Sequence, residues 1–444
     1  MDGNTLRSAL STFLPREVIR EFIEVFGVEQ RSRKRDLQAL VRSLVLVSGS
    51  DDSGRQADVY SAYLAESAKE VVRSSFYSWF TEELALLMTA LVRRALEKVR
   101  GAQPLLVGGL KGVHDWLVVD SETVALSPAL EEIFPATSTP AALKVHKTYS
   151  LGRNNVVDFV ITPARDHDAP LLQIDESWRG YGLIVDLGYA SLDLIRRCAV
   201  HGVELVLRLK NGWKPRLLRS VLECGELVDI DGEPVADDLN EMKVAEFDGS
   251  HLDYDVVVGR RSPVNARLVG VAGSESYHWF ITTLSRTTHT PRHVGQLYRT
   301  RWEIEVDNRR DKGMARLDQI QATTVSSTLT LLHAALLRTL IANHLTHQDL
   351  LMRGRKRPPL HANAVSLALC SNWQLLIIAM QIDAPERWSR LAAQIRSRGQ
   401  DPNWRRRPSQ LDRLRGTTAP PGRPRAKKLK DCPPSAEAYR RRAA

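Results

Sequence analysis

The chain has 444 residues, of which 43% are hydrophobic and 26% charged, and Lys and Arg outnumber Asp and Glu by 62 to 52. This composition excludes wholesale disorder and fibrous classes, and the length allows several structural units. The most apolar helical stretch, residues 329–345, is interrupted by His333, Arg338 and His344. We therefore expect no membrane span and no membrane partner.

Neither the opening residues nor the cysteines indicate export. The chain begins MDGNTLRSAL, without the basic cap and apolar block of a secretory signal. The cysteines lie far apart and lack the spacing of a zinc site. They are Cys198, Cys224, Cys370 and Cys432. We therefore expect reduced thiols in a cytoplasmic protein.

Residues 1–104 are predicted to form a helical N-terminal region. Segments 16–27, 35–49 and 80–100 repeat apolar residues at the helical period. Aromatic residues gather at 76–80, where they either seat two helices against one another or present a surface to DNA.

From residue 105 the hydrophobic period changes to two, and a mixed α/β region is predicted over residues 105–212. Three strands come first, and then helical segments alternate with strands. The predicted strands are 116–126, 141–151, 154–164, 182–186 and 203–210, and the predicted helical segments are 170–180 and 190–202. This order matches an RNase H-like core, so the predicted fold class is α/β.

Residues 213–289 are β-rich and predict an antiparallel insertion into that core. Its expected strands are 225–230, 242–247, 254–261, 266–273 and 277–285. Two Asp-Gly pairs, Asp231-Gly232 and Asp248-Gly249, have hairpin-turn chemistry. The core is expected to resume at residues 290–347, with one helix from Pro291 through residue 313.

The C-terminal part divides into residues 348–400, expected to be helical, and a basic tail, 401–444. The tail has 13 Lys and Arg against 4 Asp and Glu, and thus nearly all of the net charge of +10. Its Pro and Arg content predicts disorder. It either binds a polyanion or is a solvated extension.

Two aspartates end apolar runs of predicted strands. Asp120 follows residues 117–119 and Asp186 follows residues 183–185. Active sites of α/β sheets lie at such strand ends, and two carboxylates on adjacent strands could share a divalent metal ion. Each aspartate taken alone could equally be a helix N-cap or a turn residue.

A second group of polar residues recurs at helical spacing. Tyr298, Arg301, Glu305 and Lys312 would fall within an arc of roughly 60° on one α-helix. Such a face could also be a surface salt-bridge ladder, because Arg301 and Glu305 form an i,i+4 pair.

Together, the Y-x2-R-x3-E-x6-K spacing, the two strand aspartates and the β insertion resemble the signature of DDE transposases of the insertion-sequence-four family. The resemblance covers most of residues 10–345, including DSETVAL and VDLGYAS around the aspartates and YRTRWEIE before the glutamate. Members of this family usually continue with apolar residues after the glutamate, whereas residues 306–311 here are strongly polar.

The resemblance implies that Asp120, Asp186 and Glu305 are the catalytic acids and bind catalytic metal. Oxygen-only ligands favour Mg²⁺, with Mn²⁺ as a substitute, and two ions suit phosphoryl transfer. The family pattern implies cleavage and strand transfer at the ends of an insertion sequence, in a cut-and-paste scheme with a hairpinned DNA end.

The same resemblance implies supporting roles for other residues and for partners. Tyr298, Arg301 and Lys312 suit contacts to DNA phosphates. Trp279 either stacks on a flipped base or belongs to the core of the insertion. The expected partners are double-stranded DNA, as terminal inverted repeats and as target, and a second copy of the chain, with residues 348–400 as the expected dimerisation region.

Two other functions remain open. A DNA-binding relic of a transposase would keep the fold and its hold on DNA but lack turnover. A nuclease of the same fold would lack specificity for the element's ends.

Overall fold

The structure is a computed structural model that describes most of the chain. The described residues are 1–25, 36–47, 55–67, 70–221, 227–229, 236–313, 317, 320, 322–352, 358–401, 408–416 and 434–443. They form two compact units, each made from separate stretches of chain. Unit 1 comprises Met1–Leu105, Ser121–Asp166 and Glu305–Trp404, and unit 2 comprises Leu106–Asp120, His167–Ile304 and Arg405–Ala444.

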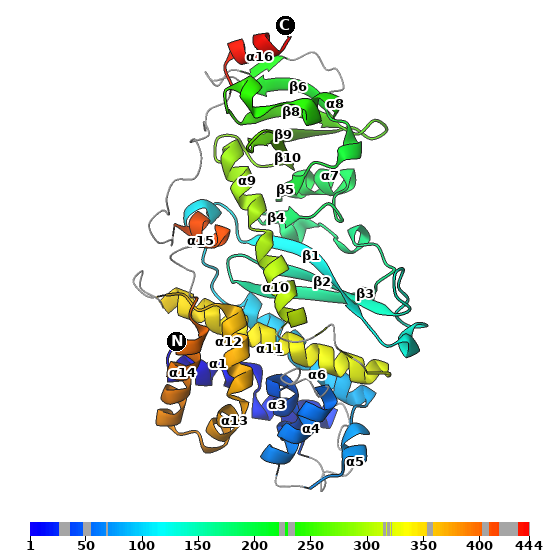
Figure 1. Ribbon diagram of the computed structural model, residues 1–444, viewed down its shortest axis with the longest axis vertical. Helices are drawn as coiled ribbons and strands as arrows, with labels where there is room; N and C mark the ends of the chain where they lie inside the picture. The colour runs from blue at the N-terminus through cyan, green and yellow to red at the C-terminus, as the bar shows by residue number, and fades with distance from the viewer. Residues whose placement is uncertain are drawn as a thin grey trace. The chain divides into compact units, whose positions relative to one another are not determined.

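Unit 1 is mainly helical (Figure 1). Its helices are α1 (Gly3–Phe13), α2 (Arg16–Val25), α3 (Leu37–Val47), α4 (Arg55–Glu66), α5 (Arg73–Tyr77), α6 (Glu82–Arg100), α10 (Trp302–Gly313, from Glu305 onward), α11 (Val325–Met352), α12 (Ala362–Ser371), α13 (Trp373–Ile382) and α14 (Pro385–Gly399). The helices predicted at 16–27, 35–49 and 80–100 are therefore confirmed over their described residues, whereas residues 26–27, 35 and 48–49 lie outside the described part of the chain. In α6, acidic residues in the first turn and basic residues in the last complement the helix dipole.

The aromatic residues at 76–80 belong to the interior of unit 1. The Phe76 ring lies 5.3 Å from the ring of Trp79 and 5.5 Å from that of Tyr63. Its side chain is fully buried. Of the two interpretations of this cluster, core packing is confirmed.

Helix α11 accounts for the most apolar stretch of the sequence. Among the described helices it has the length and composition to cross a membrane, and α12 with α13 would do so only as a pair bent by 72°. In α11, 83% of the most apolar window is buried inside the protein. It packs against α1, α3, α6 and α12, and lies beside α6 in Figure 1. The interior of unit 1 thus explains its apolar sequence.

The strands form one sheet in the order β3-β2-β1-β4-β5-β10-β9-β8-β6-β7. Their bounds are β1 (Trp116–Ala125), β2 (Ala142–Ser150), β3 (Asn155–Pro163), β4 (Gly182–Val185), β5 (Glu204–Arg208), β6 (Arg216–Val221), β7 (Leu227–Asp229), β8 (Leu252–Val258), β9 (Val264–Ala272) and β10 (Tyr277–Thr282). Strand β4 is parallel to both β1 and β5, whereas β2 and β3 are antiparallel. The order β3-β2-β1-β4-β5 is that of an RNase H-like core, and the predicted α/β class is confirmed.

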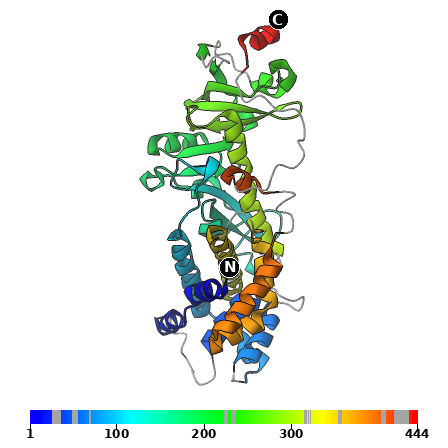
Figure 2. The same cartoon turned by 90° about the vertical axis from the view of Figure 1, so that its left-hand side faces the viewer.

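In unit 2, helices α7 (Leu192–His201) and α9 (Pro291–Arg299) cover opposite faces of the sheet (Figure 2). Helix α7 shares an apolar core with Leu268 of β9. A Cβ on Gly295 of α9 would instead come within 2.9 Å of Val271 of the same strand. Leu268 and Val271 are three residues apart on β9, and side chains three apart on a strand point to opposite faces. The two helices therefore contact opposite faces of the sheet.

The insertion is antiparallel, as predicted, but it is not separate from the core sheet. Strand β10 pairs with β5 of the core, with Ile281 opposite Leu207. Strands β9, β8, β6 and β7 follow outward. The Asp231-Gly232 turn lies outside the described residues, and the other Asp-Gly pair ends a 3₁₀ helix rather than a hairpin.

Two predicted elements are wrong. Residues 170–180 form two 3₁₀ turns instead of a helix, and the second begins where the Asp175 side chain accepts a hydrogen bond from the Ser177 amide. Residues 242–247 contain the 3₁₀ helix η6 (Val244–Phe247) instead of a strand. Val244 and Phe247 are both buried, and a spacing of three suits a 3₁₀ turn.

The tail also contains order that its composition did not predict. Helices α15 (Gln410–Arg415) and α16 (Ala436–Ala443) both belong to unit 2. The Tyr439 ring of α16 lies 5.3 Å from that of Phe247, and its hydroxyl donates a hydrogen bond to Tyr254. Disorder is therefore the wrong prediction for these two segments, whereas residues 402–407 and 417–433 lie outside the described part of the chain.

Candidate active site

The two strand aspartates leave neighbouring parallel strands at the same level of the sheet. Val119 of β1 is paired with Val185 of β4, and Asp120 and Asp186 are the next residues on their strands. The apolar residues before them are buried on both faces, as expected of central parallel strands. Both aspartates are half-buried. The two aspartates are thus neighbours in the strand register, but only Asp186 follows a strand end, because β1 continues past Asp120 to Ala125.

A basic residue extends this row. Val185 of β4 is also paired with Leu207 of β5, and Arg208 is the residue after Leu207. Asp120, Asp186 and Arg208 therefore occupy equivalent positions on three adjacent strands. Arg208 was not predicted from the sequence, because only the register reveals that it is aligned with the acids.

All three residues are directed to the sheet face that α9 covers. Val119, Val185 and Leu207, one position earlier, belong to the apolar core on the α7 face. Side chains alternate along strands, so the next residue points to the opposite face.

Helix α9 brings Tyr298 to this face. Its ring centroid lies 4.9 Å from that of Phe280 of β10. Burial is the main cause that raises the pKa of Tyr298, and the Asp186 carboxylate raises it further, whereas Arg301 and Arg208 oppose the rise. The phenol is therefore within electrostatic reach of both an acid and a base of the strand-end row.

The single helix predicted from Pro291 to residue 313 is interrupted. Helix α9 ends at Arg299 and α10 begins at Trp302. Between them the Arg301 amide donates to the Tyr298 carbonyl, and the Glu303 amide donates to the Thr300 carbonyl, which is the pattern of a tight turn. The four signature residues therefore do not share one helix face.

The turn nevertheless keeps two of them together. The Arg301 guanidinium carbon lies 5.9 Å from the centre of the Tyr298 ring, a distance typical of a cation–π contact. Glu305 and Lys312 lie two helical turns apart on α10, and both are half-buried. Glu305 begins the last stretch of unit 1, whereas Asp120 and Asp186 belong to unit 2. The convergence of Glu305 with the two aspartates therefore stays a prediction.

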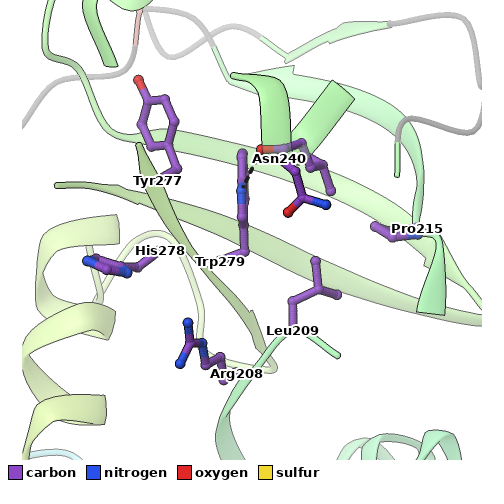
Figure 3. A pocket seen from close by; sticks show the side chains of 8 residues that line it. Arg208, Leu209, Pro215, Asn240, Tyr277, His278 and Trp279 are labelled. Atoms are coloured by element: carbon purple, nitrogen blue, oxygen red, sulfur yellow. Dashed lines mark hydrogen bonds between the residues drawn. The ribbon is translucent and has the colours of Figure 1, made fainter. Parts of the chain in front are cut away.

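Trp279 lies on the other face of the sheet from Tyr298. Its side chain belongs to the apolar core with α7, and only 7% of it is exposed. The indole Nε1 donates a 3.0 Å hydrogen bond to the Leu239 carbonyl. Trp279 also lines a cavity of about 90 Å³ with Arg208 and His278 (Figure 3). These contacts are those of a core residue, and a role in base stacking remains a prediction.

The carboxylates of this site have the chemistry of a Mg²⁺ or Mn²⁺ site, because all of the ligand atoms would be oxygens. Asp120 and Asp186 would supply two such ligands from adjacent strands. Across the described residues, no group of three His, Cys, Asp or Glu side chains is arranged to hold one ion. Glu305 is one of the residues covered by this statement, so its role as a third ligand stays a prediction.

Comparison with known proteins identifies a matching family. Residues 111–340, just over half of the chain, match the family described as transposase DDE domain. This stretch contains Asp120, Asp186 and Glu305.

Two individual proteins are also similar. The first is the transposase for insertion sequence element IS1151 of Clostridium perfringens, 18% identical over 270 residues that cover 51% of this chain and 56% of that protein. The chain thus spans little more than half the length of this relative. The second is the cryo-EM structure of a piggyBac transposase synaptic complex with hairpin DNA, at 9% identity and a TM-score of 0.47, covering 95% of this chain and 87% of that chain.

The family match includes β1, β4 and the helix that carries Glu305, and it extends over more than half of the sequence. The chain belongs to the transposase DDE domain family.

Proposed function

We propose that this protein is the transposase of a bacterial insertion sequence of the insertion-sequence-four type, acting in the cytoplasm on nucleoid DNA. It cuts double-stranded DNA at the terminal inverted repeats of its element and joins the freed ends to target DNA. The observation that carries this proposal is the row formed by Asp120 and Asp186 on paired parallel strands, on the face that also holds Tyr298.

In this proposal Asp120, Asp186 and Glu305 hold two Mg²⁺ ions, for which Mn²⁺ can substitute. When bound, such ions would offset negative charge on the attacking and leaving oxygens of an in-line displacement. A water first attacks the scissile phosphate and the 3′ oxygen leaves. The freed 3′-hydroxyl then attacks a second phosphate, either in the opposite strand to form a hairpin or in target DNA. In both cases the new ester bond replaces the bond to the 3′ oxygen of the attacked strand, which leaves.

The basic residues around the aspartates bind the DNA phosphates. Arg208 follows the strand row, and Arg301 lies in the turn beside Tyr298. Guanidinium groups suit this role because they bind phosphate oxygens through paired, charge-assisted hydrogen bonds. Tyr298 can donate a hydrogen bond to a phosphate, and Lys312 supplies a further positive charge.

Other parts of the chain hold the DNA and the second protomer. Residues 1–104 bind the element's end, and residues 348–400 form the contact between two copies in the DNA complex. The basic tail binds DNA without sequence preference, through its net charge.

The central test compares Glu305→Ala with Glu303→Ala. Both residues are acids of α10, but they point about 160° apart around the helix. The substrate is DNA that carries the inverted repeats flanking the gene. A gel-shift assay measures binding to the end, and a cleavage assay with Mg²⁺ uses the same protein preparation.

We expect Glu305→Ala to abolish cleavage and to bind the end normally, because most affinity comes from phosphate contacts elsewhere. Glu303→Ala should cut like the wild type. Cleavage by Glu305→Ala would refute the assigned role. Binding without cleavage by the wild type would identify a relic, and equal cleavage of end and random DNA would identify a general nuclease.

A further inference from the structure

The buried face of α10 in unit 1 is polar. Asp307, Asn308, Arg310 and Asp311 are all at least nine-tenths buried, although they follow directly on the segment that carries Glu305. Among the residues before Asp307 on this helix, Ile304 is the buried apolar side chain. Helix α10 is therefore held by hydrogen bonds and ion pairs rather than by an apolar stripe.

Lys147 of β2 is at the centre of these contacts, and its side chain is fully buried. Its Nζ donates to Asn308 Oδ1 at 3.0 Å and to Asp307 Oδ2 at 3.5 Å, and it also bonds Asp311. On the other side, Nζ lies 2.5 Å from Glu122 Oε1 of β1. One ammonium group thus connects β1, β2 and α10.

Helix α11 completes this cluster. Thr339 donates a 2.6 Å hydrogen bond to Asp311, and Asn343 donates a 2.9 Å hydrogen bond to Asp307. Arg310 donates to the same Asp307 oxygen at 2.8 Å. Both aspartates of α10 therefore accept directional bonds from two sides, which fixes the rotation of the helix as well as its distance from the sheet.

Groups of opposite charge face one another within this cluster. Burial by itself lowers the pKa of Lys147, but the carboxylates of Asp311, Glu122 and Asp307 outweigh burial and raise it above its ordinary value. Burial raises the pKa of Glu122 to about 8, in spite of the nearby ammonium. Lys147 and Arg310 thus face the side chains of Asp307, Asp311 and Glu122.

Both ends of this connection lie next to a proposed metal ligand in the sequence. Asp307 comes two residues after Glu305 on α10, so Glu305 is directed about 160° away from Asp307. Glu122 comes two residues after Asp120 on β1, on the same side of the strand. A small rotation of α10 would therefore redirect the Glu305 carboxylate.

We propose that Lys147 is a positioning residue that sets the orientation of Glu305 by joining helix α10 to strand β1. This inference rests on the proposed function, because it assigns Lys147 a task only if Glu305 binds metal. Lys147 touches no substrate. Residues that orient metal ligands typically contribute about tenfold to a hundredfold in metal affinity, and misplacement of a reacting group by about 1 Å can cost a hundredfold in rate.

The test uses the full chain and Mn²⁺ alone as the probe. Calorimetric titration measures Mn²⁺ affinity, and thermal unfolding measures stability. Lys147→Met removes the ammonium at similar length but strands two buried carboxylates, which can prevent folding. The second variant, K147M/D311N, removes one of those carboxylates as well and leaves Asp307 paired with Arg310.

The matched control is Arg42→Met. Arg42 of α3 pairs with Glu66 of α4, both side chains are buried in unit 1, and neither helix carries a proposed ligand. This control should therefore lose stability as the Lys147 variants do, while keeping its Mn²⁺ affinity.

We expect Mn²⁺ affinity to fall tenfold to a hundredfold in whichever Lys147 variant folds, and to remain within twofold of the wild type in Arg42→Met. Unchanged Mn²⁺ affinity in a folded Lys147 variant would overturn the proposal and make the cluster purely structural. Failure of the wild type to bind Mn²⁺ or to cut DNA is a separate result. It would overturn the proposed function, and the role of Lys147 with it.

Discussion

Asp120 and Asp186 follow two residues, Val119 and Val185, that are directly paired on neighbouring parallel strands. Because parallel strands keep an even register, the two carboxylates leave the sheet at the same level. Asp120 lies within β1 and Asp186 directly follows β4, and a run of buried apolar residues precedes each of them. Two carboxylates placed in this way should act together in binding and catalysis.

The first prediction tests whether Asp120 and Asp186 act together. Asp186→Asn should reduce Mg²⁺-dependent cleavage by about a thousandfold or more, because a lost metal ligand removes several kcal/mol of transition-state stabilisation. Adding Asp120→Asn should lower the rate little further, since residues that act as a unit are not additive. The measurement is single-turnover cleavage. Asp175→Asn, at an exposed acid of the same unit, is the control.

The second prediction concerns Arg208. Arg208→Ala should weaken end binding or slow cleavage by about tenfold to a hundredfold, the effect of losing one charged hydrogen bond of about 1.5–3 kcal/mol. Arg216→Ala removes an exposed arginine from β6 of the same unit and should change neither. Equal effects of both substitutions would mean that the arginines contribute only general charge.

Features of this site that depend on residues close together in the sequence could be predicted, whereas features that depend on contacts between distant segments could not. The strands of Asp120 and Asp186 were predictable, because runs of β-branched residues identify them locally. Arg208 was not, because its place beside the acids is set by pairing between strands. The break between α9 and α10 has no Pro or Gly to mark it.

The polar segment after Glu305 shows the same limit. In the sequence, Asp307 and Asp311 have no visible partner, whereas in the structure both bond Lys147, which lies at least 160 residues earlier in the chain. The apolar period of a helix cannot reveal a buried face made of charges. Similarly, Val244 and Phe247 fit a strand pattern as well as the 3₁₀ turn that they form.

The third prediction concerns the basic tail. Replacing its five central Lys and Arg residues by Gln should weaken binding to end DNA and random DNA by a similar factor. The slope of log affinity against log salt should become shallower by about 0.9 for each phosphate that the tail no longer neutralises. The five residues are Arg423, Arg425, Lys427, Lys428 and Lys430.

Binding curves at several salt concentrations provide this measurement. An unchanged slope would show that the tail is only a solvated extension. Loss of preference for the end would show that the tail, rather than the folded regions, recognises the element.

The fourth prediction concerns stability against pH. Burial is the main cause that lowers the pKa of His333 to about 4, from an unfolded value of 6.5. As pH falls below 6.5, His333 binds a proton in the unfolded chain but not in the folded chain. Stability should therefore fall between about pH 6.5 and pH 4, by up to about 3 kcal/mol from this group.

Thermal unfolding at pH 7 and pH 5 measures this effect. In His333→Leu the difference between the two midpoints should be smaller than in the wild type, because one source of proton uptake is gone. Arg42→Met serves as the control, since it lowers stability without removing a histidine. An equal pH dependence in His333→Leu and the wild type would contradict the assignment.

The pairing of β10 with β5 has a consequence for how the domain can be rebuilt. Without residues 213–289, the backbone amides and carbonyls of β5 that now pair with β10 at Arg208, Leu207 and Val206 would lose their partners. A bare edge of buried apolar residues is a template for aggregation. Shortened or chimeric versions of this domain should therefore keep β10, or supply another strand in its place, if they are to remain monodisperse.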